Sequence, residues 1–108
     1  MTTQEIRDEL ARMDGFTRHE PPGGGDPYWT HESSRDPFYA DPHPATRDGA
    51  AAAMPEGWTW GRGWNVLRWI ATKTGTCWAD GVQVPDTGDE IHDRYSLALA
   101  ARKAQVTR

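Results

Sequence analysis

The amino-acid sequence predicts an α+β fold: a small antiparallel sheet of three to four strands, with an N-terminal helix and a C-terminal helix packed on it, plus a long Pro/Gly/aromatic loop. Apolar residues recur at helical spacing near both ends of the chain, and this predicts the two helices. Between them, short runs of tryptophan and β-branched residues alternate with glycine-containing turns, which predicts the sheet. The length of 108 residues fits a single domain, 1–108.

Residues 2–14 are predicted to form a short amphipathic helix. Thr2 and Glu5 have the spacing of a capping box, in which the side chain of each residue accepts a hydrogen bond from the backbone amide of the other. Gly15 stands where a left-handed residue commonly ends a helix. The apolar stripe of this helix consists of Ile6, Leu10 and Met13.

Residues 16–45 are predicted to be an irregular loop, because their prolines and the Gly23-Gly24-Gly25 run exclude a long helix or a central strand. Disordered tracts are usually poor in aromatic residues. This segment contains five of them: Phe16, Tyr28, Trp29, Phe38 and Tyr39. Loops of this length in a compact domain are usually functional or mobile.

Within this loop, one short pattern occurs twice. Asp26-Pro-Tyr-Trp29 and Asp36-Pro-Phe-Tyr39 each combine a turn-starting Asp-Pro with two aromatic residues. We expect each turn to aim its aromatic pair inward, so that the loop folds over the sheet as a clasp. The four rings either complete the core or line a site, and the pattern leaves both alternatives open.

Residues 46–54 are predicted to form a second, short helix. Thr46 can cap it, the alanines at 50–53 favour it, and Pro55 with Gly57 ends it.

The antiparallel sheet is predicted over 58–85, with strands at 58–60, 64–71, 76–79 and 82–85. Turns are predicted at 61–63, at 72–75 and at Asp80-Gly81, where Asp-Gly is the strongest two-residue hairpin signal in the chain. In the second strand, alternation places Trp64, Val66, Arg68 and Ile70 on one face and Asn65, Leu67, Trp69 and Ala71 on the other. Neither face is cleanly polar, which favours a sheet covered on both sides.

The C-terminal helix is predicted over 88–104. Thr87 and Glu90 again have capping-box spacing, and Asp89 lies where the helix dipole favours an acidic residue. The buried stripe is predicted to contain Ile91, Tyr95, Ala98, Leu99 and Arg102, broadened by Leu97 and Ala101.

Two segments, Ala50–Trp60 (AAAAMPEGWTW) and Val84–Ala104 (VPDTGDEIHDRYSLALAARKA), resemble small phage and prophage proteins of the phage ABA sandwich domain family. The likeness covers about half of the chain and is compositional more than motif-exact. It implies helices packed on a small antiparallel sheet and a phage origin. It implies no established activity and no catalytic residues. The Asp-Pro-aromatic repeats depart from the family's pattern.

Composition excludes several classes of partner. The net charge of −4 and the scattered arginines and lysines argue against binding to duplex nucleic acid. Cys77 is the single cysteine, so we expect a buried strand residue rather than a disulfide or a zinc cluster. The sequence lacks an apolar run of about 18 residues, so we expect no membrane partner and a soluble protein in the cytoplasm, that of the host cell if it is phage-encoded. The mean hydropathy of −0.83 makes a homo-oligomer possible.

The sequence predicts no enzyme, no cofactor and no metal site. His19, His31 and His43 lack the short fixed spacing of metal ligands and are interpreted as solvated loop residues. No serine or cysteine lies in a nucleophile elbow. The acidic residues near the start of the last helix, Asp89, Glu90 and Asp93, are explained by the helix dipole.

The candidate binding residues are aromatic residues and arginines. Five of the six tryptophans lie within 58–78, and tryptophan suits half-exposed positions that meet a ring, a base or another protein. Tryptophan with arginine is the minimum equipment for holding a nucleotide and is equally typical of protein-binding hot spots. The candidates are Trp29, Tyr39, Trp58, Trp60, Arg62, Trp64, Arg68 and Trp69.

Three functions remain after these exclusions. The leading hypothesis is a non-enzymatic, phage-encoded accessory protein that inhibits a host protein, such as a component of an antiviral defence system, through this Trp/Tyr/Arg-rich surface. The first alternative is an oligomeric sponge that sequesters a nucleotide signalling molecule. The second is an orphan structural or accessory domain whose tryptophans form the core and a dimer contact.

Overall fold

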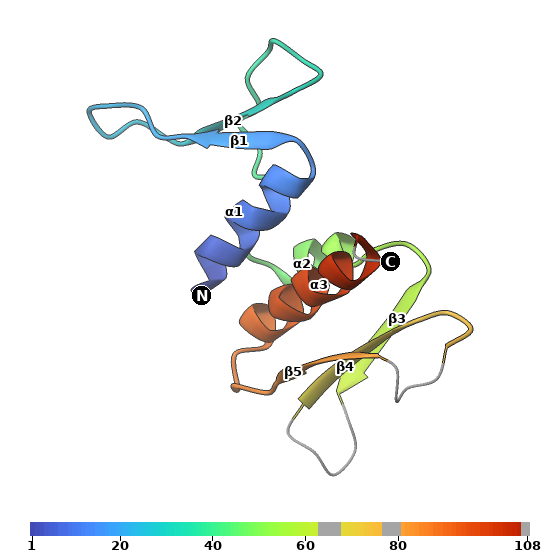
Figure 1. Ribbon diagram of the computed structural model, residues 1–108. Coiled ribbons are helices and arrows are strands. Elements are labelled where there is room, and N and C mark those ends of the chain that lie inside the picture. The colour runs from blue at the N-terminus through green and yellow to red at the C-terminus, as the bar shows by residue number, and fades with distance from the viewer. Residues whose placement is uncertain (63–67, 77–80, 107–108) are drawn as a thin grey trace.

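Figure 1 shows the computed structural model of the chain, which describes residues 1–62, 68–76 and 81–106. Helices stand at both ends and strands lie between them, so the predicted α+β class is confirmed. The elements follow in the order α1 (Thr3–Met13), β1 (Phe16–His19), β2 (Tyr28–His31), α2 (Arg47–Ala53), β3 (Trp58–Arg62), β4 (Arg68–Lys73), β5 (Val82–Pro85) and α3 (Glu90–Val106).

Strands β3, β4 and β5 form an antiparallel sheet in sequence order. Gly61 and Arg62 were predicted as a turn but continue β3, because Arg62 pairs with Trp69 across the ladder. β4 runs on to Lys73, past its predicted end at 71, and the turn at Gly75 follows with a φ of +92°. Cross-strand hydrogen bonds have thus extended both strands beyond the local turn signals.

β5 pairs with β4, with Ala71 opposite Val82. The strand predicted at 76–79 and the hairpin turn predicted at Asp80-Gly81 fall almost wholly on 77–80, outside the described residues. The remaining predictions for 63–67 and 77–80, including those for Trp64 and Cys77, lie outside the described residues.

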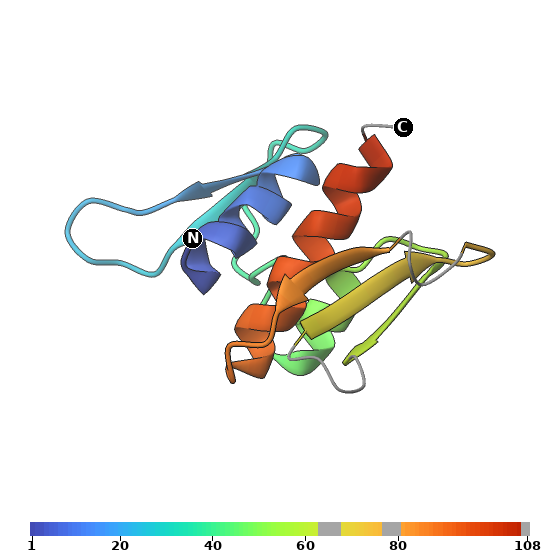
Figure 2. The same ribbon diagram turned by 60° about the horizontal axis from the view of Figure 1, so that its bottom comes forward.

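Helix α3 covers one face of this sheet, as Figure 2 shows. Trp69 of β4 points to that face and packs with Leu97 of α3. In the described part of the chain no helix covers the other face, where Arg68 is exposed. No described helix therefore supplies the second cover, and the segments 63–67 and 77–80 that flank this face lie outside the described residues. Thr72 on the same face is nevertheless only 4% exposed. The pattern in which neither face is cleanly polar is that of β4. The neighbouring strands β3 and β5 place the exposed polar residues Thr59 and Gln83 on the outer face.

The first two helices begin at the caps predicted for them. Thr2 accepts a hydrogen bond from the Glu5 amide at 3.2 Å, and Glu5 accepts one from the Thr2 amide at 3.1 Å, which completes the capping box. The bond from the Thr2 amide lowers the pKa of the Glu5 carboxyl below its ordinary value. Thr46 caps α2 by accepting from the Gly49 amide at 3.0 Å.

The apolar stripe of α1 differs from the prediction at one position. Ile6 and Leu10 are buried, but Met13 is 40% exposed. Ala11 is buried in its place. Met13 lies in the last turn, just before Gly15 reverses the chain with a φ of +87°, so it has no further helix turn to pack beside.

Helix α3 begins two residues later than predicted. The Asp89 side chain accepts from the His92 amide at 3.1 Å, so Asp89 caps the helix. Thr87, the predicted cap, instead donates to the buried Asp93 at 2.6 Å. The predicted buried stripe of α3 is otherwise largely confirmed. Neither α3 nor any other helix in the described ranges is both long and apolar enough to cross a membrane.

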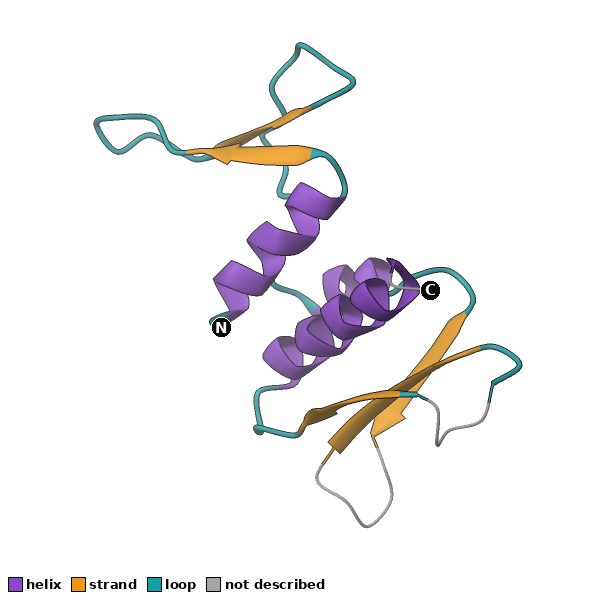
Figure 3. Cartoon of the chain, in the orientation of Figure 1, coloured by secondary structure: helices purple, strands orange, loops and turns teal. Residues whose placement is uncertain are grey.

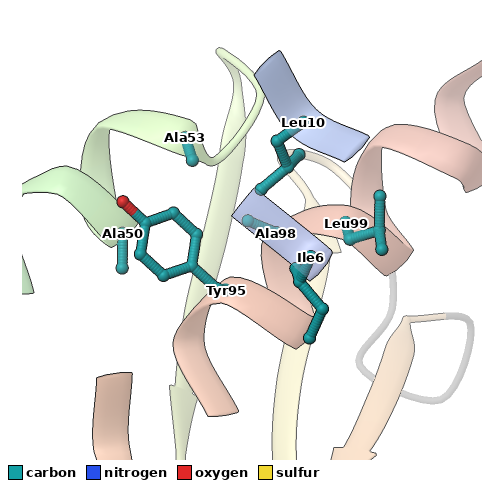
Figure 4. Close-up of a cluster of buried hydrophobic side chains, with 7 residues drawn as sticks. All are labelled: Ile6, Leu10, Ala50, Ala53, Tyr95, Ala98 and Leu99. Atoms are coloured by element: carbon teal, nitrogen blue, oxygen red, sulfur yellow. The ribbon is translucent and has the colours of Figure 1, made fainter. Parts of the chain in front are cut away.

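The described residues form two hydrophobic clusters that meet on α3. One joins Ile6 and Leu10 of α1 with α2 and with Tyr95 of α3 (Figure 4). The other joins α3 to the sheet through Leu97 and Trp69. Ile6 and Leu10 pack with α3 and α2 rather than with the three-stranded sheet.

Residues 16–45, predicted to be irregular, contain an antiparallel hairpin. β1 and β2 pair from Phe16 opposite His31 to His19 opposite Tyr28. Trp29 of β2 then bridges to Phe38, with N···O distances of 2.8 and 2.7 Å. The prolines and glycines lie in the connections, and each strand has only four residues, too few for alternation to be recognised in the sequence.

This hairpin projects from the rest of the molecule (Figure 3). The chain measures 48 × 29 × 20 Å, and its radius of gyration of 15.2 Å exceeds the value of about 13 Å expected for this length. Helix α1 lies between the hairpin and α3 in Figures 1 and 2. The two Asp-Pro-aromatic repeats meet each other through the bridge of Trp29 with Phe38 and do not fold over the three-stranded sheet, so the predicted clasp is wrong.

Asp14 joins the hairpin to the helices. One carboxylate oxygen accepts from His43 Nε2 at 2.7 Å and the other accepts from Arg102 of α3. Its backbone carbonyl accepts from His31 Nε2 of β2 at 2.9 Å. Three other segments thus converge on the residue that ends α1.

We predict that Gly49→Ala destabilises the protein by about 1–3 kcal/mol, because the added methyl group overpacks the contact between α2 and α3. A Cβ at this position would lie 2.8 Å from Tyr95 Oη and closer still to the Pro44 carbonyl oxygen. The same change in an open helix stabilises by about 1 kcal/mol. Urea denaturation measures the effect. Gly61→Ala, where no atom of the described residues lies within 4 Å, is the control and should not destabilise; a more stable Gly49→Ala variant would contradict the prediction.

We also predict a loss of stability in alkali that depends on Tyr95. Burial raises the pKa of Tyr95 to about 12, whereas the unfolded chain ionises near 10. The unfolded state therefore releases this proton first, and stability should fall between about pH 10 and 12 by up to about 2–3 kcal/mol. The difference in unfolding free energy between wild type and Tyr95→Phe should narrow over this interval. A difference that stays constant would show that Tyr95 does not titrate in this way.

Candidate binding surface

The structure separates the predicted binding residues into three places. Trp29 and Tyr39 belong to the projecting hairpin, and Arg68 is exposed on the outer face of the sheet. The others that the structure describes gather where the sheet meets α3: Trp58, Trp60, Arg62 and Trp69. Trp64 lies outside the described residues. The residues predicted to form one Trp/Tyr/Arg-rich surface therefore do not form one continuous surface where the structure describes them.

Arginines and indole rings stack on one another beside α3. The Arg62 guanidinium lies 4.7 Å from the centroid of the Trp69 ring. Arg94 of α3 lies 4.5 Å from the Trp60 ring and 5.7 Å from the Trp69 ring. Both arginines also hold carboxylates, Arg62 with Asp86 at 3.0 Å and Arg94 with Glu90 at 2.9 Å. We call Trp60, Arg62, Trp69 and Arg94 the arginine–tryptophan cluster.

The centre of this cluster is part of the core. Trp69 is only 4% exposed, and its Nε1 donates to Asp93 at 3.2 Å. Asp93 also accepts from the Thr87 amide at 2.9 Å and from the Thr87 hydroxyl. The buried carboxylate is thus satisfied by three donors, which explains Asp93 without a catalytic role. The prediction that Trp69 belongs to a binding surface is wrong, because folding already uses both its ring and its N–H group.

A second group of aromatic rings lies on the hairpin, and part of it is exposed. Tyr28 stacks on His19 with ring centroids 4.9 Å apart and an interplanar angle of 14°. Tyr39 lies on the other side of Tyr28, at 6.3 Å. Tyr39 is 73% exposed, whereas Tyr28 and His19 are half-buried. We call His19, Tyr28 and Tyr39 the hairpin aromatic row.

The opposite face of the hairpin shows which aromatic residues of the repeats are buried and which are exposed. Trp29 is only 6% exposed and pairs with Arg18 in the ladder, so its ring is buried by the fold. Trp29 is therefore a core residue and Tyr39 a surface residue. Alternation puts neighbours in a strand on opposite faces, so the two aromatics of each repeat diverge.

Sequence reasoning missed three residues of these two groups. His19 and Tyr28 belong to the row, and the position of Tyr28 in the first repeat was an available signal. Arg94 comes to the tryptophans from α3, a contact between distant segments that no local pattern indicates.

The histidines are less solvated than predicted. His43 is buried against Asp14, and its ring lies edge-on to Tyr95 at 6.4 Å. His19 also contacts the Thr30 hydroxyl at 2.9 Å, and His31 reaches the Asp14 carbonyl. They hold segments together rather than sit in solvent. Within the described ranges, no group of three or more His, Cys, Asp and Glu residues is placed to hold a metal ion.

We predict opposite effects of alanine at the two sites of the hairpin. Trp29→Ala should lower the free energy of unfolding by about 3 kcal/mol, because it empties a buried position. Tyr39→Ala should change it by less than about 0.5 kcal/mol, since that ring is exposed. Urea denaturation of both variants checks this. A large loss of stability in Tyr39→Ala would make Tyr39 a packing residue.

Comparison of the chain with protein-family models, with curated proteins and with solved structures finds no match. The resemblance to the phage ABA sandwich domain family therefore stays a prediction. We accordingly base the functional proposal on the geometry of the hairpin aromatic row.

Proposed function

We propose that the protein is a non-enzymatic binding protein that holds a partner protein through the hairpin aromatic row. Following the resemblance to phage proteins, we take the partner to be a host factor, such as a component of an antiviral defence system, which the bound chain would inhibit. The proposal moves the binding surface from the tryptophans of the sheet to the tyrosines of the hairpin.

The exposure of Tyr39 beside Tyr28, on an arm that projects from the helices, is the observation that carries this proposal. Tyrosine presents a large ring with little conformational freedom to lose, and its hydroxyl can pair across an interface. It is accordingly enriched at the centres of protein interfaces. Packing within the chain explains Trp29 and Trp69, but it does not explain a tyrosine that remains 73% exposed.

Nucleotide sequestration is the second candidate, and the arginine–tryptophan cluster supplies its observation. Two guanidinium groups and two indole rings lie together, as stacking and phosphate binding require. However, Arg62 and Arg94 already pair with Asp86 and Glu90, and the Trp69 ring is buried. A nucleotide would have to displace these contacts, so the geometry favours the protein partner.

The test is affinity capture from host-cell lysate with the full chain, followed by quantitative mass spectrometry. We predict that one protein is retained over several salt concentrations. It should be lost from the Tyr28→Ala/Tyr39→Ala double variant and kept by Tyr28→Phe/Tyr39→Phe, because phenylalanine preserves the rings. The alanine variant should lose at least about tenfold in affinity, which corresponds to about 1.4 kcal/mol.

Two controls separate this outcome from its alternatives. Lys73→Ala, an exposed cation at the end of β4, should leave capture unchanged. Capture of the same protein by wild type and by the tyrosine-to-alanine variant would refute the role of the row. Saturable quenching of tryptophan fluorescence by a nucleotide, abolished by Arg94→Ala, would instead establish sequestration. The absence of both responses would leave the orphan structural domain.

A further inference from the structure

The outer edge of β1 carries unpaired backbone groups. Glu32 N donates to Gly15 O at 3.0 Å, which identifies this pair as a hydrogen-bonded pair of the β1–β2 ladder. Hydrogen-bonded and non-hydrogen-bonded pairs alternate along an antiparallel ladder. The pairs of Phe16 with His31 and of Arg18 with Trp29 are therefore non-hydrogen-bonded, so Phe16 and Arg18 direct their N–H and C=O groups away from β2.

The bridge between Trp29 and Phe38, on the other side of β2, confirms this alternation of hydrogen-bonded and non-hydrogen-bonded pairs. Trp29 exchanges both backbone hydrogen bonds with Phe38, so its own groups point away from β1. Within the described residues, no hydrogen bond is found for the main-chain groups of Phe16 or Arg18. An open strand edge of this kind is a template for pairing with another chain.

A cleft of about 420 Å³ runs along this edge, between α1 and β1. Its volume falls within the range of about 300–1,000 Å³ that is typical of ligand sites. Thr17 and Arg18 both line it, together with Asp8 and Arg12 of α1 and with Glu20. Successive side chains of a strand point to opposite faces, so a cleft that touches both Thr17 and Arg18 lies along the edge of β1.

The cleft is lined by two arginines and two carboxylates, and an unpartnered donor of Arg18 is what favours an acidic group there. Arg18 Nη1 pairs with Glu20 at 2.8 Å, but its Nε is buried and lacks a partner within the described residues. Asp8 accepts a hydrogen bond from the uncharged side-chain amide of Gln4 at 2.8 Å. No ion pair is found for Arg12 among the described residues, and its side chain is exposed. A buried donor without a partner costs about 1–3 kcal/mol, and a carboxylate would satisfy it with a charge-assisted bond.

We infer that the outer edge of β1 takes up an extended segment of the partner protein as an added antiparallel strand, with an acidic side chain directed at Arg12 and Arg18. The inference rests on the proposed function, since it names how the same partner binds. The main chain of Phe16 and Arg18 supplies the backbone hydrogen bonds, and the guanidinium groups select the charge. The hairpin aromatic row then contacts the body of the partner.

A second copy of this chain is the competing occupant of the edge. Pairing centred on Arg18 would set two arginines directly opposite each other, which is destabilising between strands. Pairing centred on Thr17 would set Arg18 opposite Phe16 and bring no carboxylate to the guanidinium groups. A partner with a carboxylate in this position has no such penalty.

The experiment uses the full chain, a displayed library of random heptapeptides, and amide hydrogen exchange measured by NMR. We expect enriched peptides that alternate β-branched residues and contain at least one acidic residue. Adding such a peptide should slow exchange of the Phe16 and Arg18 amides by at least about tenfold, while the Thr17 and His19 amides are already protected within the hairpin. The same peptide with N-methylated backbone amides should lose this protection, and a lysine-for-acid version should bind at least about tenfold more weakly.

Several results would overturn the inference. These are the absence of enriched peptides, enriched peptides that protect other amides, and equal binding of the N-methylated peptide. Protection of Arg18 in the free chain, together with a dimer in sedimentation, would assign the edge to a second copy. Arg18→Pro should abolish peptide binding without breaking an internal ladder bond, and Arg18→Ala should remove only the preference for acid. Partner capture that needs Tyr39 but survives Arg18→Pro would refute the strand addition and leave the proposed function standing.

Discussion

Helix α3 is the one element that both hydrophobic clusters share, and the rest of the structure depends on its two buried sides. Tyr95 and Leu99 pack toward α1 and α2, whereas Leu97 packs toward the sheet. A chain with 36% hydrophobic residues has little apolar surface to bury, and placing the longest helix between two layers lets it stabilise both. As a consequence, polar groups on α3 are buried too. The buried Asp93 accepts hydrogen bonds from Trp69 and Thr87.

This central position of α3 explains why the tryptophan-rich segment is not the most exposed surface. Its rings supply the apolar area of the layer between sheet and helix, and Arg62 and Arg94 lie over them and neutralise Asp86 and Glu90. The hairpin stands outside this layer and is joined to it through Asp14. The aromatic row and the open edge of β1 therefore lie on an arm whose surface can bind without disturbing the core.

The candidate site was predicted only in part, and the reason lies in register. Tyr39 was selected from the Asp-Pro-aromatic repeat, and it is exposed as a binding residue requires. Trp29 was selected from the other copy of the same repeat, and it is buried. The first repeat ends in Tyr28-Trp29 and the second ends in Phe38-Tyr39. Because Trp29 pairs with Phe38 in an antiparallel bridge, Tyr28 lies beside Tyr39. Nothing in the local sequence specifies that pairing.

The sequence by itself determined the features that depend on neighbours three or four residues apart. The caps at Thr2 and Thr46, the interior of α3 and the existence of a small sheet all follow from such local spacing. Tertiary structure decided the hairpin within 16–45, the late start of α3, and which aromatic rings are buried. These features depend on contacts between distant segments, such as Thr87 with Asp93 or Arg94 with Trp60, whose energies appear only after the chain has folded.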